Sequence, residues 1–243
     1  MRLSRILAVT SFVAANLSLL GAAAYGAMTV EPFDGTLNFS TAAAMGGTTV
    51  NHAGSLGGEL DVLIEQLNGS ATVTAQNSGG TFTLGNGTGP FAISRLTLAW
   101  DGNDNNASTL NPVGLQTSGT GINLVAAGNA FRLSGLSVDL QGSFILSVFT
   151  DATHVSTRSF TLTPTVPTPM LELPFSSFTG AGANGAADFA NVGAISLQLT
   201  GGNFGLDFAI NDVSVVPEPA TATMGVGALV LLSLAHRRRR RAD

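Results

Sequence analysis

The sequence predicts an all-β fold, a single β-sandwich of the jelly-roll type, placed between two terminal targeting segments. About ten short runs alternate apolar and polar residues with a period of two, which is typical of half-buried strands. Turn-forming pairs such as Asn-Gly and Gly-Gly separate these runs, and no long stretch shows the 3.6-residue period of a helix. Many short strands at such spacing favour a sandwich.

The expected strands run through residues 27–215, which we expect to fold as one domain. Residues 58–67, the best candidate for a helical period, are expected to form one short helix. The proline-rich segment 164–174 is interpreted as a long connection or an edge segment of the same sandwich. The expected strands are residues 36–41, 71–76, 81–84, 91–100, 122–126, 131–140, 143–150, 155–162, 194–199 and 206–215.

Charge and composition narrow the classes of function. Only 10% of the residues are charged, and residues 27–216 contain three arginines and thirteen acidic residues, a formal charge of −10. A domain this acidic repels a phosphate backbone, which argues against nucleic-acid binding. The chain has no cysteine, which excludes disulfides and thiol chemistry.

Residues 1–26 have the layout of a secretory signal peptide. Arg2 and Arg5 precede an apolar stretch at 6–20, and small residues follow it. Ala24 and Gly26 fit the peptidase subsites before a cleavage at Ala27, with cleavage after Ala24 as the alternative. An uncleaved membrane anchor would have the same pattern.

Residues 220–236 are expected to form a short transmembrane helix. No charge occurs from 220 to 235, and sixteen helical residues span roughly 24 Å, a little less than a typical hydrocarbon core. A run of arginines follows, which resists translocation and holds the C-terminus in the cytoplasm. The two ends therefore predict one topology, with the domain outside and the tail inside. The arginines of the run are Arg237, Arg238, Arg239, Arg240 and Arg241.

Residues 216–243 resemble the PEP-CTERM sorting signal of Gram-negative-type bacteria. Pro217, Glu218 and Pro219, a short apolar helix and the arginine run follow one another in the order of that signal. The resemblance implies recognition and processing by an exosortase in the membrane, with Pro217, Glu218 and Pro219 as the sorting motif and residues 237–241 as the membrane stop. It also implies release or delivery to the cell surface, often in species that make exopolysaccharide. An ordinary tail anchor with a proline-rich linker is the alternative.

The domain itself resembles galactose-binding-like jelly rolls, a fold that many carbohydrate-binding modules share. The resemblance rests on residues 33–35 (Phe-Asp-Gly), 175–178 followed by 188–192, and the closing phrase at 207–213. It is mostly one of hydrophobic pattern, and it implies the fold more than the function.

Two places in the domain could bind a ligand. The alternate oxygen-bearing residues Asp101, Asn103 and Asn105 suit a calcium loop, but the same residue types form ordinary solvated turns, and we expect the turn and no metal ligand. Trp100, the only tryptophan, could stack on a sugar ring, but a tryptophan at a strand end is more often part of the core.

No arrangement of residues points to catalysis or to a cofactor. Neither His52 nor His154 has a ligand partner at metal-binding spacing, and the sequence has no nucleophile elbow or phosphate-binding loop. We therefore expect a non-catalytic surface or extracellular-matrix protein that can bind polysaccharide. The alternative is a secreted, glycan-active hydrolase whose site is built from scattered carboxylates.

Overall fold

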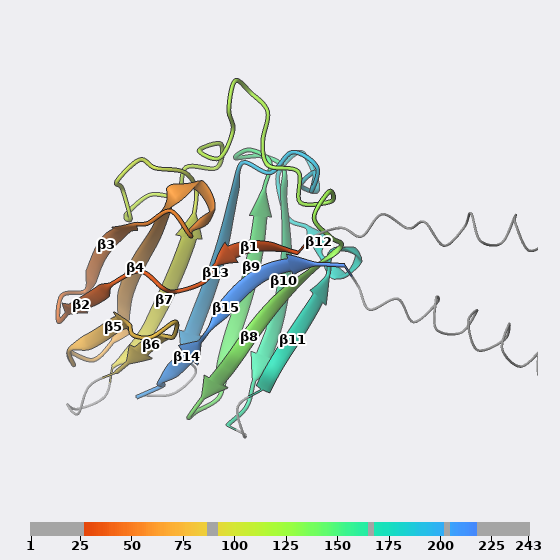
Figure 1. The fold of residues 1–243 in the computed structure, drawn as a ribbon. Helices are drawn as coiled ribbons and strands as arrows, with labels where there is room; N and C mark the ends of the chain where they lie inside the picture. Colours follow the sequence, from red (N-terminus) through yellow and green to blue (C-terminus); the bar gives the residue numbers. More distant parts are fainter. Residues whose placement is uncertain (1–26, 87–91, 165–167, 202–204, 218–243) are drawn as a thin grey trace, which may run out of the picture.

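The computed structural model describes residues 27–86, 92–164, 168–201 and 205–217, and these form two facing β-sheets (Figure 1). The expected signal peptide, residues 1–26, lies outside the described residues, as do Glu218 and the rest of the expected sorting segment after it. Within the described ranges, no helix has the length and apolar character needed to cross a membrane.

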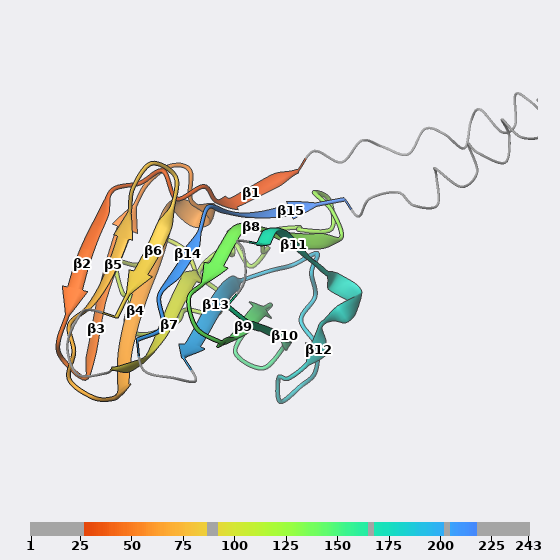
Figure 2. The ribbon, with the colours of Figure 1, turned by 90° about the horizontal axis from the view of Figure 1, so that it is seen from below.

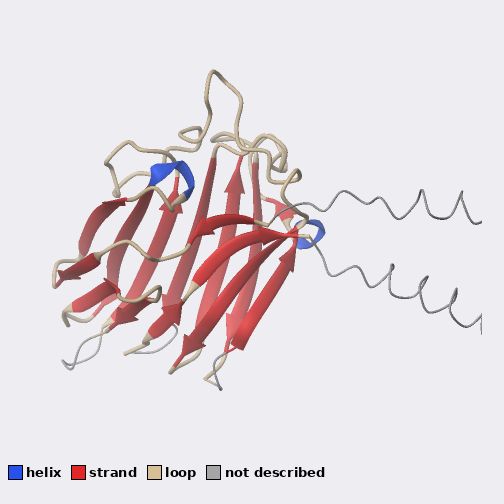
Figure 3. Ribbon diagram, in the orientation of Figure 1, coloured by secondary structure: helices blue, strands red, loops and turns tan. Residues whose placement is uncertain are grey.

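Strands make up nearly all of the regular structure, together with two short 3-10 turns, η2 (Leu56–Gly58) and η3 (Phe175–Ser177) (Figure 3). The strands are β1 (Met28–Glu31), β2 (Leu37–Thr41), β3 (Met45–Asn51), β4 (Glu59–Asn68), β5 (Val73–Asn77), β6 (Phe82–Gly85), β7 (Ile93–Trp100), β8 (Ala130–Val138), β9 (Gly142–Phe149), β10 (Val155–Leu162), β11 (Thr168–Pro174), β12 (Thr179–Gly180), β13 (Ala194–Gly201), β14 (Phe208–Ile210) and β15 (Asp212–Val216).

The two sheets stack face to face, as Figures 1 and 2 show from two directions. The front sheet has the strand order β1-β15-β8-β14-β6-β5-β2, and β11 also pairs with β8. The back sheet has the order β12-β10-β9-β13-β7-β4-β3. Every strand pair is antiparallel. The prediction of an all-β sandwich is therefore confirmed.

The core lies between the sheets and is built by the alternation of side chains along each strand. In β9, Phe144, Leu146 and Val148 are fully buried, and the residues between them are more exposed. The ring of Phe144 lies 5.5 Å, between centroids, from Phe208 on the front sheet, so aromatic contacts join the two layers. Both sheets and this core lie within residues 27–217, which therefore form a self-contained folding unit.

The chain enters and leaves the domain at the same place. Strand β1 pairs with β15, with Met28 opposite Val215. Pro217, the first residue of the expected sorting motif, directly follows β15 and is exposed. The two expected targeting segments thus join the domain at neighbouring points on one edge of the front sheet.

The expected helix at residues 58–67 is wrong, because this segment forms β4, an inner strand of the back sheet between β7 and the edge strand β3. Leu60, Val62 and Ile64 alternate into the core as strand residues do. The alternation is broken in the sequence by Leu63 and Leu67, which lie on the same face as Glu59 and Asp61 and place apolar residues at 60, 63, 64 and 67, the spacing of a helix.

The expected strand at residues 122–126 is also wrong. Only Ile122 forms a β-bridge, with Val192. The carbonyl oxygen of Leu124 then accepts the N–H groups of Ala127 and Gly128, which closes a turn. Leu124 is buried in this turn, whereas Val125 is 49% exposed, so the apolar character of the run does not mark a buried strand.

The expected final strand, residues 206–215, is divided at Asn211 into β14 and β15. Both pieces pair with β8, but β14 continues the sheet to β6 and β15 continues it to β1. At the division, Gly135 of β8 has φ = +66°, and a Cβ there would collide with the side chain of Asn211. A glycine is therefore required where the front sheet changes direction.

The remaining differences concern the edges of the sheets. The proline-rich segment contains β11, which pairs with β8 on one side only, so the edge-segment interpretation of residues 164–174 is confirmed. Prolines are tolerated there because an edge strand needs only half of its hydrogen bonds. Strands β1, β3 and β12 were not expected; β1 and β12 are short, and β3 contains Gly46 and Gly47.

Candidate functional site

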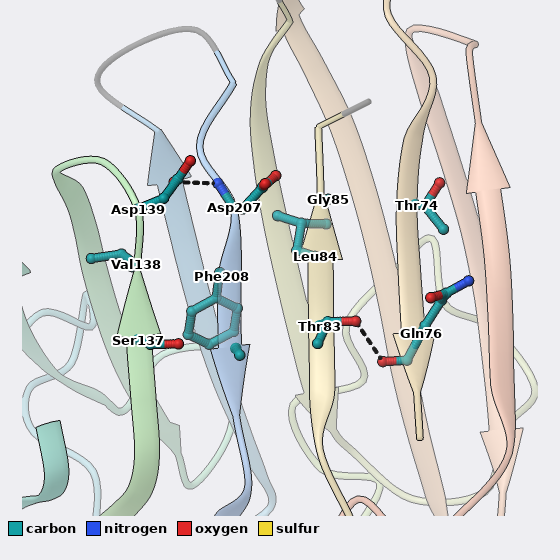
Figure 4. Close-up of a pocket in the computed structure, with 11 residues that line it drawn as sticks. Thr74, Gln76, Thr83, Leu84, Gly85, Ser137, Val138, Asp139, Asp207 and Phe208 are labelled. Carbon is teal, nitrogen blue, oxygen red and sulfur yellow. Dashed lines mark hydrogen bonds between the residues drawn. The ribbon is translucent and has the colours of Figure 1, made fainter. Parts of the chain in front are cut away.

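A groove of about 490 Å³ crosses the outer face of the front sheet, over β5, β6, β14 and the end of β8 (Figure 4). Its position follows from the topology, because the short strand β14 brings β8 alongside β6. Volumes of this size are common for small-molecule sites. The groove faces solvent, and it is separate from the core between the sheets.

The floor of the groove is one row of side chains across four strands. Gln76 lies opposite Thr83, Thr83 opposite Ala209, and Ala209 opposite Ser137. Neighbouring residues on the same strands, such as Phe208, point inward and are buried. The floor thus presents one amide, two hydroxyls and a methyl group to solvent, a neutral surface rich in hydrogen-bond donors and acceptors.

Beside the floor, a second row of residues leaves space in the groove because one of them is a glycine. Gly85 lies opposite Thr74, and a Cβ added at Gly85 would have only Asp207 Oδ1 within 4 Å, at 3.9 Å. Beside the floor, Gln76 Nε2 donates a hydrogen bond to Asn38 Oδ1 (3.2 Å) on the outermost strand, β2. Polar side chains therefore continue from the groove to the edge of the front sheet.

Two carboxylates stand together at one end of the groove, as Figure 4 shows. The backbone N–H of Asp207 donates to Asp139 Oδ1 (2.6 Å), and the backbone N–H of Asn86 donates to Asp207 Oδ1 (2.9 Å). Both side chains are exposed, and among the described residues neither Oδ2 atom accepts a hydrogen bond. The sequence alone could not single out this pair, because Asp139 and Asp207 meet only through the pairing of β8 with β14.

Trp100 belongs to the core and is not a platform for a sugar ring. Its side chain is fully buried, and Trp100 Nε1 donates a hydrogen bond to Glu31 Oε2 (3.2 Å). Among the described residues that line the groove, the one aromatic residue is Phe208, which is only 3% exposed. Any ligand in the groove would therefore be recognised by polar contacts rather than by stacking.

The two histidines of the described residues, His52 and His154, lie in separate networks. His52 Nε2 contacts Glu31 Oε1 (3.0 Å), and its Nδ1 lies 3.3 Å from Asp34 Oδ1. His154 Nδ1 lies 2.9 Å from Asp151 Oδ2. The backbone N–H of Thr153, with further hydrogen bonds from the side chains of His154 and Thr153, holds the pKa of the Asp151 carboxyl well below its ordinary value. Each histidine is thus paired with acids near it in the structure.

Asp101, Asn103 and Asn105 do not come together as a set of alternate ligands. Asp101 is buried, and its Oδ2 accepts the N–H of Asn111 (2.5 Å). Asn103 and Asn105 are exposed, and Asn105 Nδ2 donates to Asn103 Oδ1 (3.2 Å). The two asparagines thus satisfy one another in the manner of a solvated turn.

Asp101 instead joins an acidic cluster with Glu59, Asp61 and Asp104. Carboxylate oxygens of Glu59, Asp61 and Asp104 all lie within 4.8 Å of one another, and Asp61 shares a hydrogen bond with Asp101. Burial, and then the hydrogen bond with Asp101, raise the pKa of Asp61 to about 8. Burial also raises the pKa of Asp101. The cluster therefore holds more negative charge than its surroundings can accommodate.

The helix interpretation of residues 58–67 concealed the part of this cluster that lies on β4. On a strand, residues two apart share a face, so Glu59 and Asp61 point the same way. The antiparallel pairing of β4 with β7 places Asp61 opposite Ala99, and the loop that carries Asp101 and Asp104 starts two residues later. The alternation of acids at 59 and 61 was the signal that could have located this site.

Comparison with known proteins finds solved structures that are similar at low sequence identity. No family model matches any part of the chain, its C-terminal segment included, and no curated protein matches it. The carbohydrate-binding module CtCBM11 is similar at 14% identity and a TM-score of 0.40, over 82% of this chain and 99% of that one. The family 11 carbohydrate-binding module of the cellulosomal cellulase Lic26A-Cel5E of Clostridium thermocellum is similar at 14% identity and a TM-score of 0.38, over 80% and 96%. The agarase AgWH50C is similar at 12% identity and a TM-score of 0.42, over 80% of this chain and 25% of that one. Similarities this weak do not transfer a function, so function is argued from the residues of this chain.

Proposed function

We propose that the chain is an exported, non-catalytic surface or matrix protein whose front-sheet groove binds a neutral polysaccharide. The observation that carries the proposal is the groove itself, an open hollow of about 490 Å³ with a polar, uncharged floor and two carboxylates at one end. A polysaccharide presents hydroxyl groups along an extended chain, and an open groove accommodates such a chain without enclosing it.

The polar groups of the groove match a polyhydroxylated ligand. Gln76, Thr83 and Ser137 supply both donors and acceptors along one line, as sugar hydroxyls require. Asp139 and Asp207 can accept hydroxyl protons through oxygens that have no partner among the described residues. Hydrogen bonds to a charged acceptor are stronger than neutral ones, so this end would fix the position of the ligand.

Electrostatics favour a neutral ligand over an acidic one. The domain has a formal charge of −10, and two of its acids stand in the groove. A uronic acid or a sulfated sugar would be repelled by Asp139 and Asp207. Without an exposed aromatic ring in the lining, the affinity would depend on several hydrogen bonds made at once.

Delivery to the surface is the second part of the proposal. The layout of residues 1–26 supports export, and the order of motif, apolar run and arginine run in 216–243 supports sorting by an exosortase. In this scheme exosortase and the membrane are transient partners. The protein then remains at the cell surface or in the extracellular matrix, where polysaccharide is available to the groove.

A hydrolase remains the second candidate, because Asp139 and Asp207 form a pair of carboxylates at the groove. The acid of a glycosidase is usually held in an apolar enclosure that keeps it protonated. Asp139 and Asp207 are exposed, and the groove around them is open. These features favour ligand binding over hydrolysis.

A glycan array probed with residues 27–217 tests the binding proposal. We expect binding to one or more neutral polysaccharides and none to acidic ones. The variant Gly85→Leu places a side chain in the groove without backbone strain, and we expect it to weaken binding about tenfold or more. The matched control is Thr161→Leu, on an exposed position of the back sheet, which should bind as the wild type does.

Two outcomes would contradict the proposal. If the domain bound no polysaccharide on the array, the proposed function would be wrong. If Gly85→Leu bound polysaccharide with wild-type affinity, the groove would not be the binding site. Release of reducing ends from a bound polysaccharide, abolished in Asp139→Asn or Asp207→Asn, would establish the hydrolase instead.

A further inference from the structure

The acidic cluster lies where two neighbouring strands of the back sheet meet a loop. Glu59 and Asp61 begin β4, and Asp101 and Asp104 belong to the loop that follows β7. Figure 1 shows β7 ending at the top of the molecule and β8 ending at the bottom. The groove is lined by residues at that end of β8. The cluster is therefore a separate site, distant from the groove.

Three of the four carboxylates are removed from water. Glu59 is 0% exposed, Asp61 3% and Asp101 1%, whereas Asp104 is exposed at the mouth of the cluster. Buried carboxylates in such numbers are unstable as anions unless a positive charge or protons accompany them.

No arginine of the described residues supplies that positive charge. Arg95 forms a two-pronged contact with Glu65 (2.6 and 2.7 Å), and Arg132 contacts Glu172 (2.8 Å). Arg158 lies on β10, with three strands of the back sheet between β10 and β4. The chain has no lysine.

Backbone hydrogen bonds hold the carboxylates in place and leave one oxygen without a partner. Both oxygens of Glu59 accept the N–H of Asn105 (3.0 and 3.2 Å), and Asp101 Oδ2 accepts the N–H of Asn111. Asp61 Oδ1, in contrast, is buried and has no hydrogen-bond partner in the described structure. A buried, unpartnered carboxylate oxygen among other carboxylates indicates a missing positive ligand.

We propose that Glu59, Asp61, Asp101 and Asp104 bind one divalent cation, and that this cation is calcium. All the candidate ligands are oxygens, which suit hard cations such as calcium and magnesium. Oxygens of Glu59, Asp61 and Asp104 all lie within 4.8 Å of one another, close enough for one ion to contact all three. Calcium accepts several protein carboxylates in a flexible geometry, whereas magnesium demands a near-ideal octahedron and usually keeps several waters, so a cluster with three buried carboxylates favours calcium.

Binding would fasten the long loop after β7 to the start of β4. Calcium would offset two of the negative charges of the cluster and give the unpartnered Asp61 Oδ1 a ligand, so binding should stabilise the folded domain.

Residues 27–217 allow a direct test, because they contain both the cluster and the only tryptophan. After treatment with a chelator, titration with calcium chloride in a calorimeter should show one site per chain, and calcium should raise the melting temperature. Magnesium should bind about tenfold more weakly or worse. Terbium provides a local readout, because Trp100 adjoins Asp101 and excitation of Trp100 should sensitise luminescence of terbium held in the cluster.

The variants Asp61→Asn and Asp139→Asn distinguish calcium binding at the cluster from nonspecific attraction of calcium to an acidic domain. Asp61→Asn keeps the side-chain size and should reduce calcium affinity about tenfold or more, without lowering the melting temperature measured in chelator. Asp139→Asn removes an exposed acid at the groove and should leave calcium binding unchanged. Equal melting temperatures in chelator and in millimolar calcium would overturn the proposal, and so would equal losses of affinity in the two variants. Equal affinities for calcium and magnesium would overturn the assignment of the ion.

Discussion

Trp100 and Glu31 are joined across the core by a hydrogen bond of 3.2 Å, from Trp100 Nε1 to Glu31 Oε2, and both residues are fully buried. Glu31 also accepts the backbone N–H of Phe33 (2.8 Å) and contacts His52 Nε2 (3.0 Å). A glutamate at the end of β1 thus connects the front sheet to Trp100, the last residue of β7 in the back sheet. The indole N–H of Trp100, the only tryptophan, therefore has a hydrogen-bond acceptor inside the domain, and the ring is not available on the surface to stack on a ligand.

Removal of the Glu31 carboxylate should strongly destabilise the domain. Glu31→Ala leaves the Trp100 indole N–H and the Phe33 N–H without an acceptor in the core, and the loss should be about 3–5 kcal/mol. Urea unfolding of residues 27–217, followed by tryptophan fluorescence, measures this change. Asp34→Ala is the control: the Asp34 side chain is 68% exposed, and its loss should change the stability by about 0.5 kcal/mol or less. Similar losses of stability in the two variants would show that the hydrogen bonds of Glu31 do not stabilise the contact between the two sheets.

The positions of the strands were predictable where one face of the strand is exposed to solvent and the other is buried in the core. Residues 155–162 were predicted as the strand that β10 forms, and the predicted strands at 131–140 and 143–150 match β8 and β9 to within two residues at each end. The pattern was less clear in β4, because the apolar Leu63 and Leu67 lie on the same face as Glu59 and Asp61. Apolar residues at 60, 63, 64 and 67 match the spacing of a helix, and the helix interpretation followed from that spacing.

The candidate sites were less predictable, because both depend on pairing between distant strands. Asp139 and Asp207 come together through β8 and β14, and Glu59 and Asp104 through β4 and the loop after β7. The sequence suggested Asp101, Asn103 and Asn105 as alternate calcium ligands, with an ordinary turn as the expected outcome. The structure instead groups Asp101 with Asp104 of the same loop and with Glu59 and Asp61 of β4, and the spacing within the loop does not encode the two residues of β4.

The ion-free domain should become less stable as the pH rises from about 4 to about 8. Burial, with the hydrogen bond to Asp101, raises the pKa of Asp61 to about 8 in the folded state, whereas the unfolded carboxyl ionises near its ordinary value. Between these values the folded state binds a proton that the unfolded state has released, so stability falls with pH, by at most about 1.4 kcal/mol per pH unit from this group. Melting curves in chelator at pH 5 and pH 8 measure the difference.

Asp61→Asn provides the control for this pH dependence. The amide does not titrate, so the variant should lose less stability than the wild type between pH 5 and pH 8. Calcium should likewise reduce the loss in the wild type, because the cation replaces the proton. An identical pH profile in the wild type and in Asp61→Asn would show that Asp61 does not titrate in this range.

The bend of the front sheet should depend on Gly135. Gly135→Ala places a Cβ against the Asn211 side chain at a residue with φ = +66°, and the combined strain should cost about 1–3 kcal/mol. Gly85→Ala on the same sheet is the matched control, since its Cβ would meet only Asp207 Oδ1 at 3.9 Å. Thermal unfolding compares the stability of the two variants. A Gly135→Ala variant as stable as the wild type would mean that the Asn211 side chain rotates away from the new Cβ at no cost in stability.

Sorting should depend on the motif that directly follows β15. Replacement of Pro217, Glu218 and Pro219 by alanine leaves the signal peptide, the domain and the apolar run intact, so export should proceed. Processing should fail, because an exosortase would have no recognition motif, and an uncleaved, membrane-bound form should accumulate. Immunoblots of membrane, surface and medium fractions from a strain that has an exosortase measure this.

The tail test has its own control in the domain. Asp139→Asn changes the groove and leaves residues 216–243 untouched, so that variant should be processed and delivered as the wild type is. If the alanine-substituted protein reached the surface at its normal size, residues 216–243 would be an ordinary tail and not an exosortase signal. The protein would then have to reach the cell surface by another route. The proposal that the groove binds polysaccharide would not be affected, because the glycan array tests it independently of sorting.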